Sequence, residues 1–109
     1  MNNENFENAI KRHISIIEGN LLNKAKEYAS DVDRLHNFTQ GARIENQTTE
    51  RVIWGIALKH LISVKDIISD IEKGKIPSQQ FLDEKLGDWS TYMALLYASI
   101  QDKINNETK

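Results

Sequence analysis

The stretch LDEKLGDWSTYMALLYASI, from Leu82 to Ile100, carries the side chains best suited to chemistry. Glu84 and Asp88 are four residues apart, which places both carboxylates on one face of a helix. Such a pair can hold a hard cation such as Mg²⁺ when a substrate's phosphates supply the other ligands. The same carboxylates could equally be charges at a solvated helix edge, paired with Lys85 or Lys59. From spacing alone, the solvated helix edge is the favoured interpretation.

A second acidic pair, Asp66 and Asp70, repeats this spacing on the preceding helical stretch. If the two helices pack antiparallel, Asp66 could face Glu84 and Asp88 across a groove, and two helices that each offer carboxylates can build a metal site. The predicted Mg²⁺ site therefore comprises Asp66, Glu84 and Asp88. For Asp70 a solvated position is the favoured interpretation.

Three polar residues, His13, Lys24 and His60, fall within or beside apolar helical stripes. A buried lysine is costly unless it pairs with a carboxylate or a ligand anion. A single inward histidine is more often a hydrogen-bonded core residue than a ligand. Three such residues in a small core indicate a polar pocket, although separate hydrogen-bonded positions remain the alternative.

The segment DRLHNF, Asp33 to Phe38, gathers further binding chemistry beside a glycine-containing break. The guanidinium of Arg34 suits phosphate oxygens, and His36 and Asn37 can contact a base or a ribose. Tyr92, one turn beyond Asp88, could join them. For Phe38 the favoured role is to anchor a short helix in the core.

Helical periodicity accounts for most of the chain. It predicts long helices from about Asn5 to Ala29, Thr49 to Lys73 and Ser78 to Asn105, with a short helix within 31–45. Apolar stripes predict the buried faces of the first and third helices: Phe6, Ile10, Ile14, Ile17, Leu21, Ala25 and Tyr28, and Leu82, Leu86, Trp89, Met93, Leu96, Ile100 and Ile104. We therefore expect one all-α domain, residues 1–109, folded as an antiparallel helical bundle. Three helices bury only a modest core, so a dimer or higher oligomer is expected.

Composition excludes several classes of protein. The chain has 109 residues, no cysteine and a formal net charge of −2, so a disulfide framework, a thiolate metal site and a basic nucleic-acid-binding surface are not expected. Its apolar runs are too short for a membrane span, and its polar, acidic N-terminus does not resemble a signal peptide. A cytoplasmic protein that binds neither membranes nor nucleic-acid duplexes is the simplest interpretation.

Three blocks carry a resemblance to a known family: KAKEYASDVDRLHNF (Lys24 to Phe38), WGIALKHLISVKDII (Trp54 to Ile68) and LDEKLGDWSTYMALL (Leu82 to Leu96). They resemble small phage-encoded proteins similar to the all-α MazG-like nucleoside triphosphate pyrophosphohydrolases and to a nucleotide-modification-associated domain. The resemblance spans about residues 18–103. It places Glu84, Asp88 and Tyr92 on the last core helix, and Lys24, Glu27 and Tyr28 ahead of the arginine-containing segment.

The resemblance implies Mg²⁺-dependent cleavage between the α and β phosphates of a nucleotide. Glu84 and Asp88 would then be the catalytic acids, with Lys24 and Arg34 on the phosphates. The chain lacks the EExxE motif of that family, and its acidic pair is spaced ExxxD. Two alternatives therefore stand beside catalysis: a protein that sequesters a nucleotide, including a host immune signal, without cleaving it, and a pure protein-interaction module.

Overall fold

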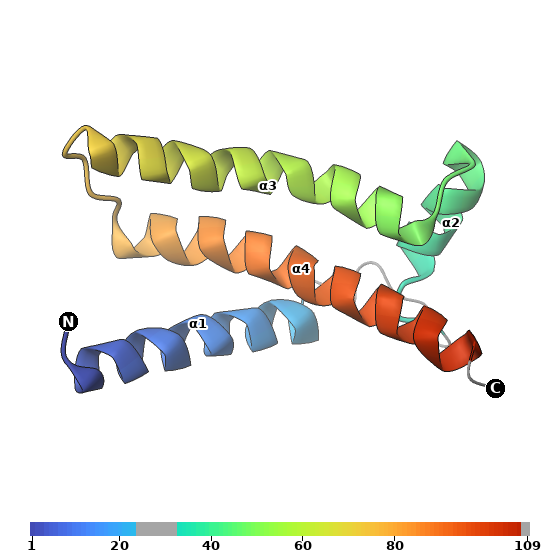
Figure 1. Ribbon diagram of the computed structural model, residues 1–109, viewed down its shortest axis with the longest axis horizontal. Helices are drawn as coiled ribbons and strands as arrows, with labels where there is room; N and C mark the ends of the chain where they lie inside the picture. The colour runs from blue at the N-terminus through green and yellow to red at the C-terminus, as the bar shows by residue number, and fades with distance from the viewer. Residues whose placement is uncertain (24–32, 108–109) are drawn as a thin grey trace.

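The protein is seen here in a computed structural model that describes residues 1–23 and 33–107. The described residues form helices and no strands: α1 (Asn3–Asn23), α2 (His36–Glu45), α3 (Thr49–Glu72) and α4 (Gln79–Glu107). Three long helices and one short helix confirm the predicted all-α fold (Figure 1). The predicted continuation of the first helix to Ala29 lies outside the described residues.

Local sequence signals fix both ends of α3 and the start of α4. The Thr48 side chain caps α3 by accepting a hydrogen bond from the Arg51 backbone N–H at 3.1 Å. After α3 the chain turns at Gly74, whose φ of +84° strongly favours glycine. Ser78 then caps α4, since its hydroxyl accepts from the Phe81 N–H at 3.1 Å. These boundaries agree with the sequence prediction.

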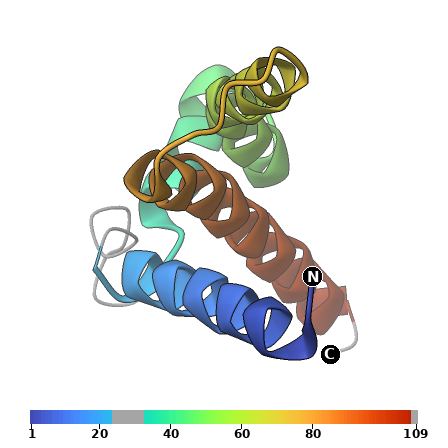
Figure 2. The ribbon, with the colours of Figure 1, turned by 90° about the vertical axis from the view of Figure 1, so that its left-hand side faces the viewer.

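Helix α4 lies between α1 and α3, and among the described residues α1 and α3 make no direct contact (Figures 1 and 2). Helices α3 and α4 form an antiparallel hairpin, whereas α1 runs in the same direction as α4. The short α2 packs across the N-terminal part of α3. The molecule is consequently elongated, with extents of 47 × 28 × 25 Å.

The core is concentrated at one end of the hairpin, where α2 meets α3 and α4. Phe38, Ile53 and Leu95 form its buried centre, with Phe38 1% exposed and Ile53 0% exposed. Half-buried apolar residues surround them: Leu21, Leu35, Val52, Ile56, Tyr92 and Leu96. The expectation that Phe38 anchors the short helix is therefore confirmed.

The predicted buried stripe of α4 was wrong in its position on the helix. None of its seven residues is buried, and Leu82, Ile100 and Ile104 are 39%, 46% and 52% exposed. The buried positions of α4 are instead four mostly small residues at a four-residue spacing: Gly87, Thr91, Leu95 and Ser99. Small residues let neighbouring helices approach closely, so α1 and α3 pack against this edge. The large apolar stripe is half-buried at Leu86, Trp89, Met93 and Leu96 and exposed toward its two ends.

The predicted buried stripe of α1 is likewise largely open. No α1 residue is buried, and Phe6, Ile10 and Ile14 are 56%, 44% and 50% exposed. The reason is that, within the described part of the chain, α4 is the one helix whose Cα atoms come within 8 Å of those of α1, and α1 touches it through the edge that carries Arg12 and Ile16. Within residues 1–23 and 33–107, no helix combines the length and apolar character that a membrane span requires.

Candidate functional site

An imidazole, a carboxylate and a phenol meet between the midpoints of α3 and α4. The rings of His60 and Tyr92 stack with centroids 4.9 Å apart and an interplanar angle of 20°. The His60 Nδ1 atom lies 3.9 Å from the Asp88 Oδ2 atom, and the two side chains are only 15% and 17% exposed. We call these three residues the His60–Asp88–Tyr92 cluster. Three of the residues predicted for a ligand or a metal are thus brought together.

The helices fix this cluster because Asp88 and Tyr92 are one turn apart on α4, and α3 crosses them antiparallel. A second aromatic pair, Trp54 and Trp89, holds the same two helices edge to face, with ring centroids 6.1 Å apart and an angle of 67°. The Tyr92 ring also packs against the buried core. The cluster therefore sits on the best-packed seam of the molecule, where its geometry is held firmly.

The predicted metal ligands are not gathered into one site. The Glu84 carboxylate forms an ion pair with Lys85 at 3.5 Å and is 56% exposed, as the solvated-edge interpretation expects. Asp66 is exposed on α3. In the described part of the chain, no group of three or more histidine, aspartate or glutamate side chains could hold a metal ion. The donor set thus does not fit a metal held by the protein alone, and we derive no step through one.

The two inward histidines of the described chain occupy different sides of α4. The His13 Nε2 atom and the Ser90 hydroxyl oxygen are 2.9 Å apart and share a hydrogen bond. Ser90 is two residues from both Asp88 and Tyr92, which at about 100° per residue points it away from the cluster. His13 and His60 therefore do not share one polar pocket, and each follows the alternative of a separately partnered position.

Further polar contacts join α1 to α4, and the sequence analysis had not singled out their α4 partners. The Asn20 amide donates to the Thr91 hydroxyl at 3.0 Å, and that hydroxyl donates to the Gly87 carbonyl at 2.7 Å. Polar side chains at half-buried positions signal that a partner exists, but the partner is about 71 residues away along the chain. Only the helix packing reveals it.

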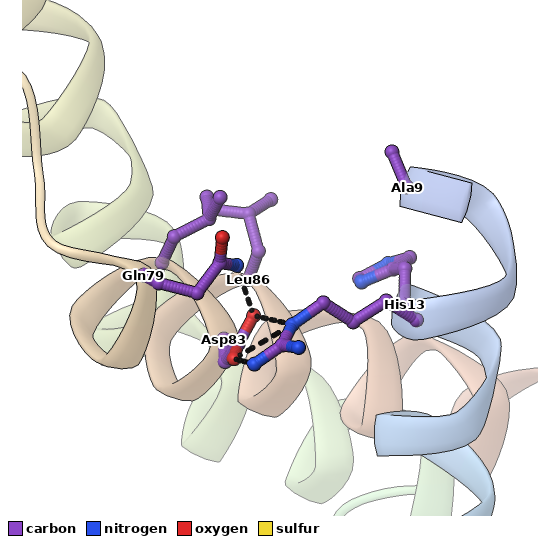
Figure 3. A pocket seen from close by; sticks show the side chains of 7 residues that line it. Ala9, His13, Gln79, Asp83 and Leu86 are labelled. Carbon is purple, nitrogen blue, oxygen red and sulfur yellow. Dashed lines mark hydrogen bonds and ion pairs between the residues drawn. The ribbon is translucent and has the colours of Figure 1, made fainter. Parts of the chain in front are cut away.

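A charged pair closes one end of the α1–α4 seam. The Arg12 guanidinium donates to both Asp83 carboxylate oxygens at 2.6–3.2 Å, and the Gln79 amide donates to the same carboxylate at 2.8 Å. Hydrogen bonds from Arg12 and then Gln79 hold the pKa of Asp83 below its ordinary value. A shallow hollow of about 330 Å³ lies beside this pair, lined also by His13 and Leu86 (Figure 3). The carboxylate is already fully engaged, which leaves this hollow without an obvious anchor for a ligand.

Glu50 ties the start of α3 to the end of α4. Its two carboxylate oxygens accept hydrogen bonds from the Ser99 hydroxyl and the Lys103 ammonium. Burial acts to raise the pKa of Glu50, but the hydrogen bonds from Lys103 and Ser99 outweigh it, so the pKa lies below its ordinary value. This contact is a structural clamp on the hairpin.

The arginine-containing segment lies at the other end of α3 from the interhelical turn. The Arg34 guanidinium donates to the Leu21 carbonyl at 3.2 Å, which connects it to the end of α1. His36 is half-buried at the first position of α2, and Asn37 is exposed. A hollow of about 440 Å³ borders Arg34, Asp33 and Asp102. Arg34, His36 and Asn37 thus form a group near the core end, distinct from the mid-helix cluster.

The remaining predicted binding residues, Lys24, Glu27 and Tyr28, lie outside the described residues. Their predicted role on a ligand's phosphates therefore stays a prediction. Comparison of the chain with protein-family models, curated proteins and solved structures finds no match.

Proposed function

We propose that the protein binds a nucleotide at the His60–Asp88–Tyr92 cluster and sequesters it without cleaving it. The observation that carries the proposal is the stack of the nearly parallel His60 and Tyr92 rings beside the Asp88 carboxylate. Stacked rings extend naturally to a planar base, and a carboxylate accepts hydrogen bonds from a base amine or a ribose hydroxyl. The sequence resemblance supports the same ligand class.

Binding of the phosphates is assigned to two cations, of which Arg34 lies near the core end of the bundle. Arginine carries five N–H donors in a planar fork, and the Arg34 contact with Leu21 uses one of them. Lys24 is the second cation proposed for the phosphates, with His36, Asn37 and Tyr92 at the sugar or base. Glu27 and Tyr28 are further binding residues that the resemblance implies. In this proposal the ligand spans from the aromatic cluster to Arg34, in a cytoplasmic protein that captures a host signal nucleotide as phage anti-defence proteins do.

Sequestration is placed ahead of hydrolysis because of the carboxylates. Cleavage in the MazG-like manner requires several acids around Mg²⁺, and the described residues gather no such group. Magnesium-dependent nucleoside triphosphate pyrophosphohydrolysis remains the second candidate, since Glu84 and Asp88 occupy one helix edge and nucleotide phosphates can complete a Mg²⁺ shell. Its signature is release of pyrophosphate that Asp88→Asn abolishes.

One experiment separates these candidates. The purified protein is denatured, and the released small molecules are identified by mass spectrometry, in parallel with calorimetric titration of a nucleotide panel in Mg²⁺ and in EDTA. Sequestration predicts an intact nucleotide and binding that survives EDTA. Pyrophosphate or a monophosphate product would instead establish hydrolysis. A protein that binds nothing in the panel and releases no nucleotide would be a pure interaction module, and the proposal would be rejected.

Matched histidine variants test the location of the site. His60→Ala removes half of the stack, so we expect nucleotide affinity to fall about 10- to 100-fold, the scale of one lost stacking or charged contact. His13→Ala removes a histidine on the other side of α4 and should leave affinity unchanged. Equal affinities for the two variants would place the ligand elsewhere.

A further inference from the structure

The apolar stripes of α1 and α4 that remain uncovered lie on one side of the molecule. On α1 the spacing of Phe6, Ile10, His13 and Ile17 makes a single stripe, and on α4 Leu86, Ser90, Met93 and Tyr97 do the same. The His13–Ser90 hydrogen bond of 2.9 Å joins the two stripes directly. The interior polar members of the two stripes thus form a hydrogen bond with each other, and the other members of these stripes are apolar.

Helix α3 extends this surface on the far side of α4. Trp54 contacts Trp89, which belongs to the same large apolar stripe of α4. From Trp54 the α3 stripe continues at helical spacing through Leu58 and Ile62, which are 40% and 60% exposed. We call the combined surface the open apolar face; its most exposed members are Phe6, Ile10, Ile14, Leu58, Ile62, Leu82, Tyr97, Ile100 and Ile104.

A contiguous apolar surface of this extent is unusual on a monomer and marks an interaction site. Its charged borders indicate which partner covers it. On α1, exposed Glu7 and Glu18 lie on the same side of the helix as Ile14, because they come seven residues before it and four residues after it. On α3, exposed Arg51 and Lys65 border the Trp54–Leu58 stripe: Arg51 comes three residues before Trp54, and Lys65 comes seven residues after Leu58. Exposed Lys11 also lies on the α1 border and exposed Asp66 on the α3 border, so the first border is acidic and the second is basic in net charge.

We propose that a second copy of this chain covers the open apolar face, with α1 of each copy lying against α3 of the other. A two-fold axis parallel to α4 brings the acidic border of one copy to the basic border of its partner, so one surface complements itself. An axis perpendicular to α4 within the interface would instead place acidic border on acidic border. Charge complementarity selects the first arrangement.

Helix register identifies a specific pair of residues for this dimer. Because Ile16 meets Gly87 and α1 runs parallel to α4, Glu18 stands at the level of Trp89. Because His60 stands between the levels of Asp88 and Tyr92 and α3 runs antiparallel, Lys65 stands near the level of Lys85. A rotation about an axis parallel to α4 does not change these levels, so Glu18 and Lys65 of different copies differ by about 6 Å along the helices.

The first test is the mass in solution of the full chain, by sedimentation equilibrium and light scattering. We expect twice the 12.5 kDa of one chain. Ile14→Asp and Ile100→Asp, on different helices of the open apolar face, should each raise the dimer dissociation constant at least about 100-fold while the circular dichroism stays helical. Ile44→Asp is the matched control, because Ile44 is 82% exposed on α2, away from the face. A monomeric parent, or equal effects of Ile44→Asp and Ile14→Asp, would overturn the proposal.

The second test reads the arrangement of the copies. The chain has no cysteine, so introduced cysteines cross-link only with each other. A chain with Glu18→Cys mixed with a chain with Lys65→Cys should form a disulfide-linked pair, whereas Glu18→Cys alone should form little. The reverse outcome would show α1 against α1 and reject the proposed axis.

Charge reversal adds a check. Glu18→Lys and Lys65→Glu should each weaken the dimer about 3- to 10-fold, and the double variant should recover the parent's dimer affinity. This inference does not depend on nucleotide binding, so the two proposals can fail separately.

Discussion

The two seams that flank α4 are built on different principles. On the α3 side, buried apolar residues dominate: Ile53 and Ala57 are 0% exposed, and Phe38 from α2 fills the space beside them. On the α1 side no α1 residue is buried, and the helices are joined by hydrogen bonds from Arg12, His13 and Asn20. Burial drives folding, whereas a polar pair as exposed as Arg12–Asp83 contributes little net free energy, and the His13–Ser90 and Asn20–Thr91 bonds are only part-buried. We therefore expect the α2–α3–α4 unit to contribute more of the stability than α1, which reaches the core through Leu21.

The largest expected effect lies at the centre of the α3 seam. Phe38→Ala leaves a cavity in the core, so we expect the free energy of unfolding to fall by about 3–5 kcal/mol. Leu22→Ala on α1 is the matched control and should cost less than about 1 kcal/mol, because Leu22 is 63% exposed and lies outside the open apolar face. Urea unfolding followed by circular dichroism measures both. Similar losses for the two variants would break the distinction between the seams.

A glycine pair tests how closely α1 approaches α4. A Cβ atom built on Gly87 would lie 2.7 Å from the Ile16 Cγ2 atom, closer than packed carbons come. Gly87→Ala should therefore force the helices apart and destabilise the protein by about 1–3 kcal/mol. Adding Ile16→Ala removes the clashing methyl group and should recover part of that loss in thermal unfolding.

The control for this substitution is Gly55, a helical glycine of α3 with no heavy atom within 4 Å of a built Cβ. Gly55→Ala should stabilise the protein by about 0.5–1 kcal/mol, because alanine favours the helix more than glycine does. If Gly87→Ala stabilised the chain as Gly55→Ala does, the close approach of α1 would not exist.

The next smaller effect is the loss of stability from the Glu50 clamp as the pH falls. Its folded-state pKa is lowered, so the clamp contributes stability above the ordinary carboxylate pKa of about 4 and loses it as the pH falls through the lower folded-state value. We expect Glu50→Gln to cost about 1 kcal/mol at pH 7 and to lose less stability than the parent between about pH 4 and pH 2. Thermal unfolding across this range measures the difference. Parallel curves for parent and variant would show that Glu50 is not clamped.

The sequence predicted the elements and their ends because those depend on neighbouring residues. The predicted ends of the second and third long helices depend on Thr48, Gly74 and Ser78, which act through hydrogen bonds or backbone angles within a few positions. It also offered the pairing of Glu84 with Lys85 as an alternative, and that ion pair is present. The ligand-binding roles of His60 and Tyr92 stay predictions.

The same sequence could not identify which face of α4 is buried. Large apolar residues at helical spacing predicted the stripe through Met93, whereas the helices meet at Gly87 and Thr91. Apolar periodicity predicts which face of a helix is shielded from water, whether by the same chain or by a second one. It does not identify the neighbour that shields the face. The partners of His13 and Asn20 were hidden for the same reason, since contacts between α1 and α4 depend on packing.

The smallest effect is expected at the outer end of the α1 seam, and it sharpens the comparison most. Asp83→Asn removes the carboxylate that accepts hydrogen bonds from Arg12 but keeps the shape of the side chain. Arg12 is more than half exposed, so water and salt screen the pair, and the melting temperature should fall by only about 1–2 °C in low salt. In about 1 M salt, where charges are screened within roughly 3 Å, parent and variant should melt together. A loss as large as that of Phe38→Ala, or one that persists in high salt, would show that α1 is integral to the core and that both seams share one principle.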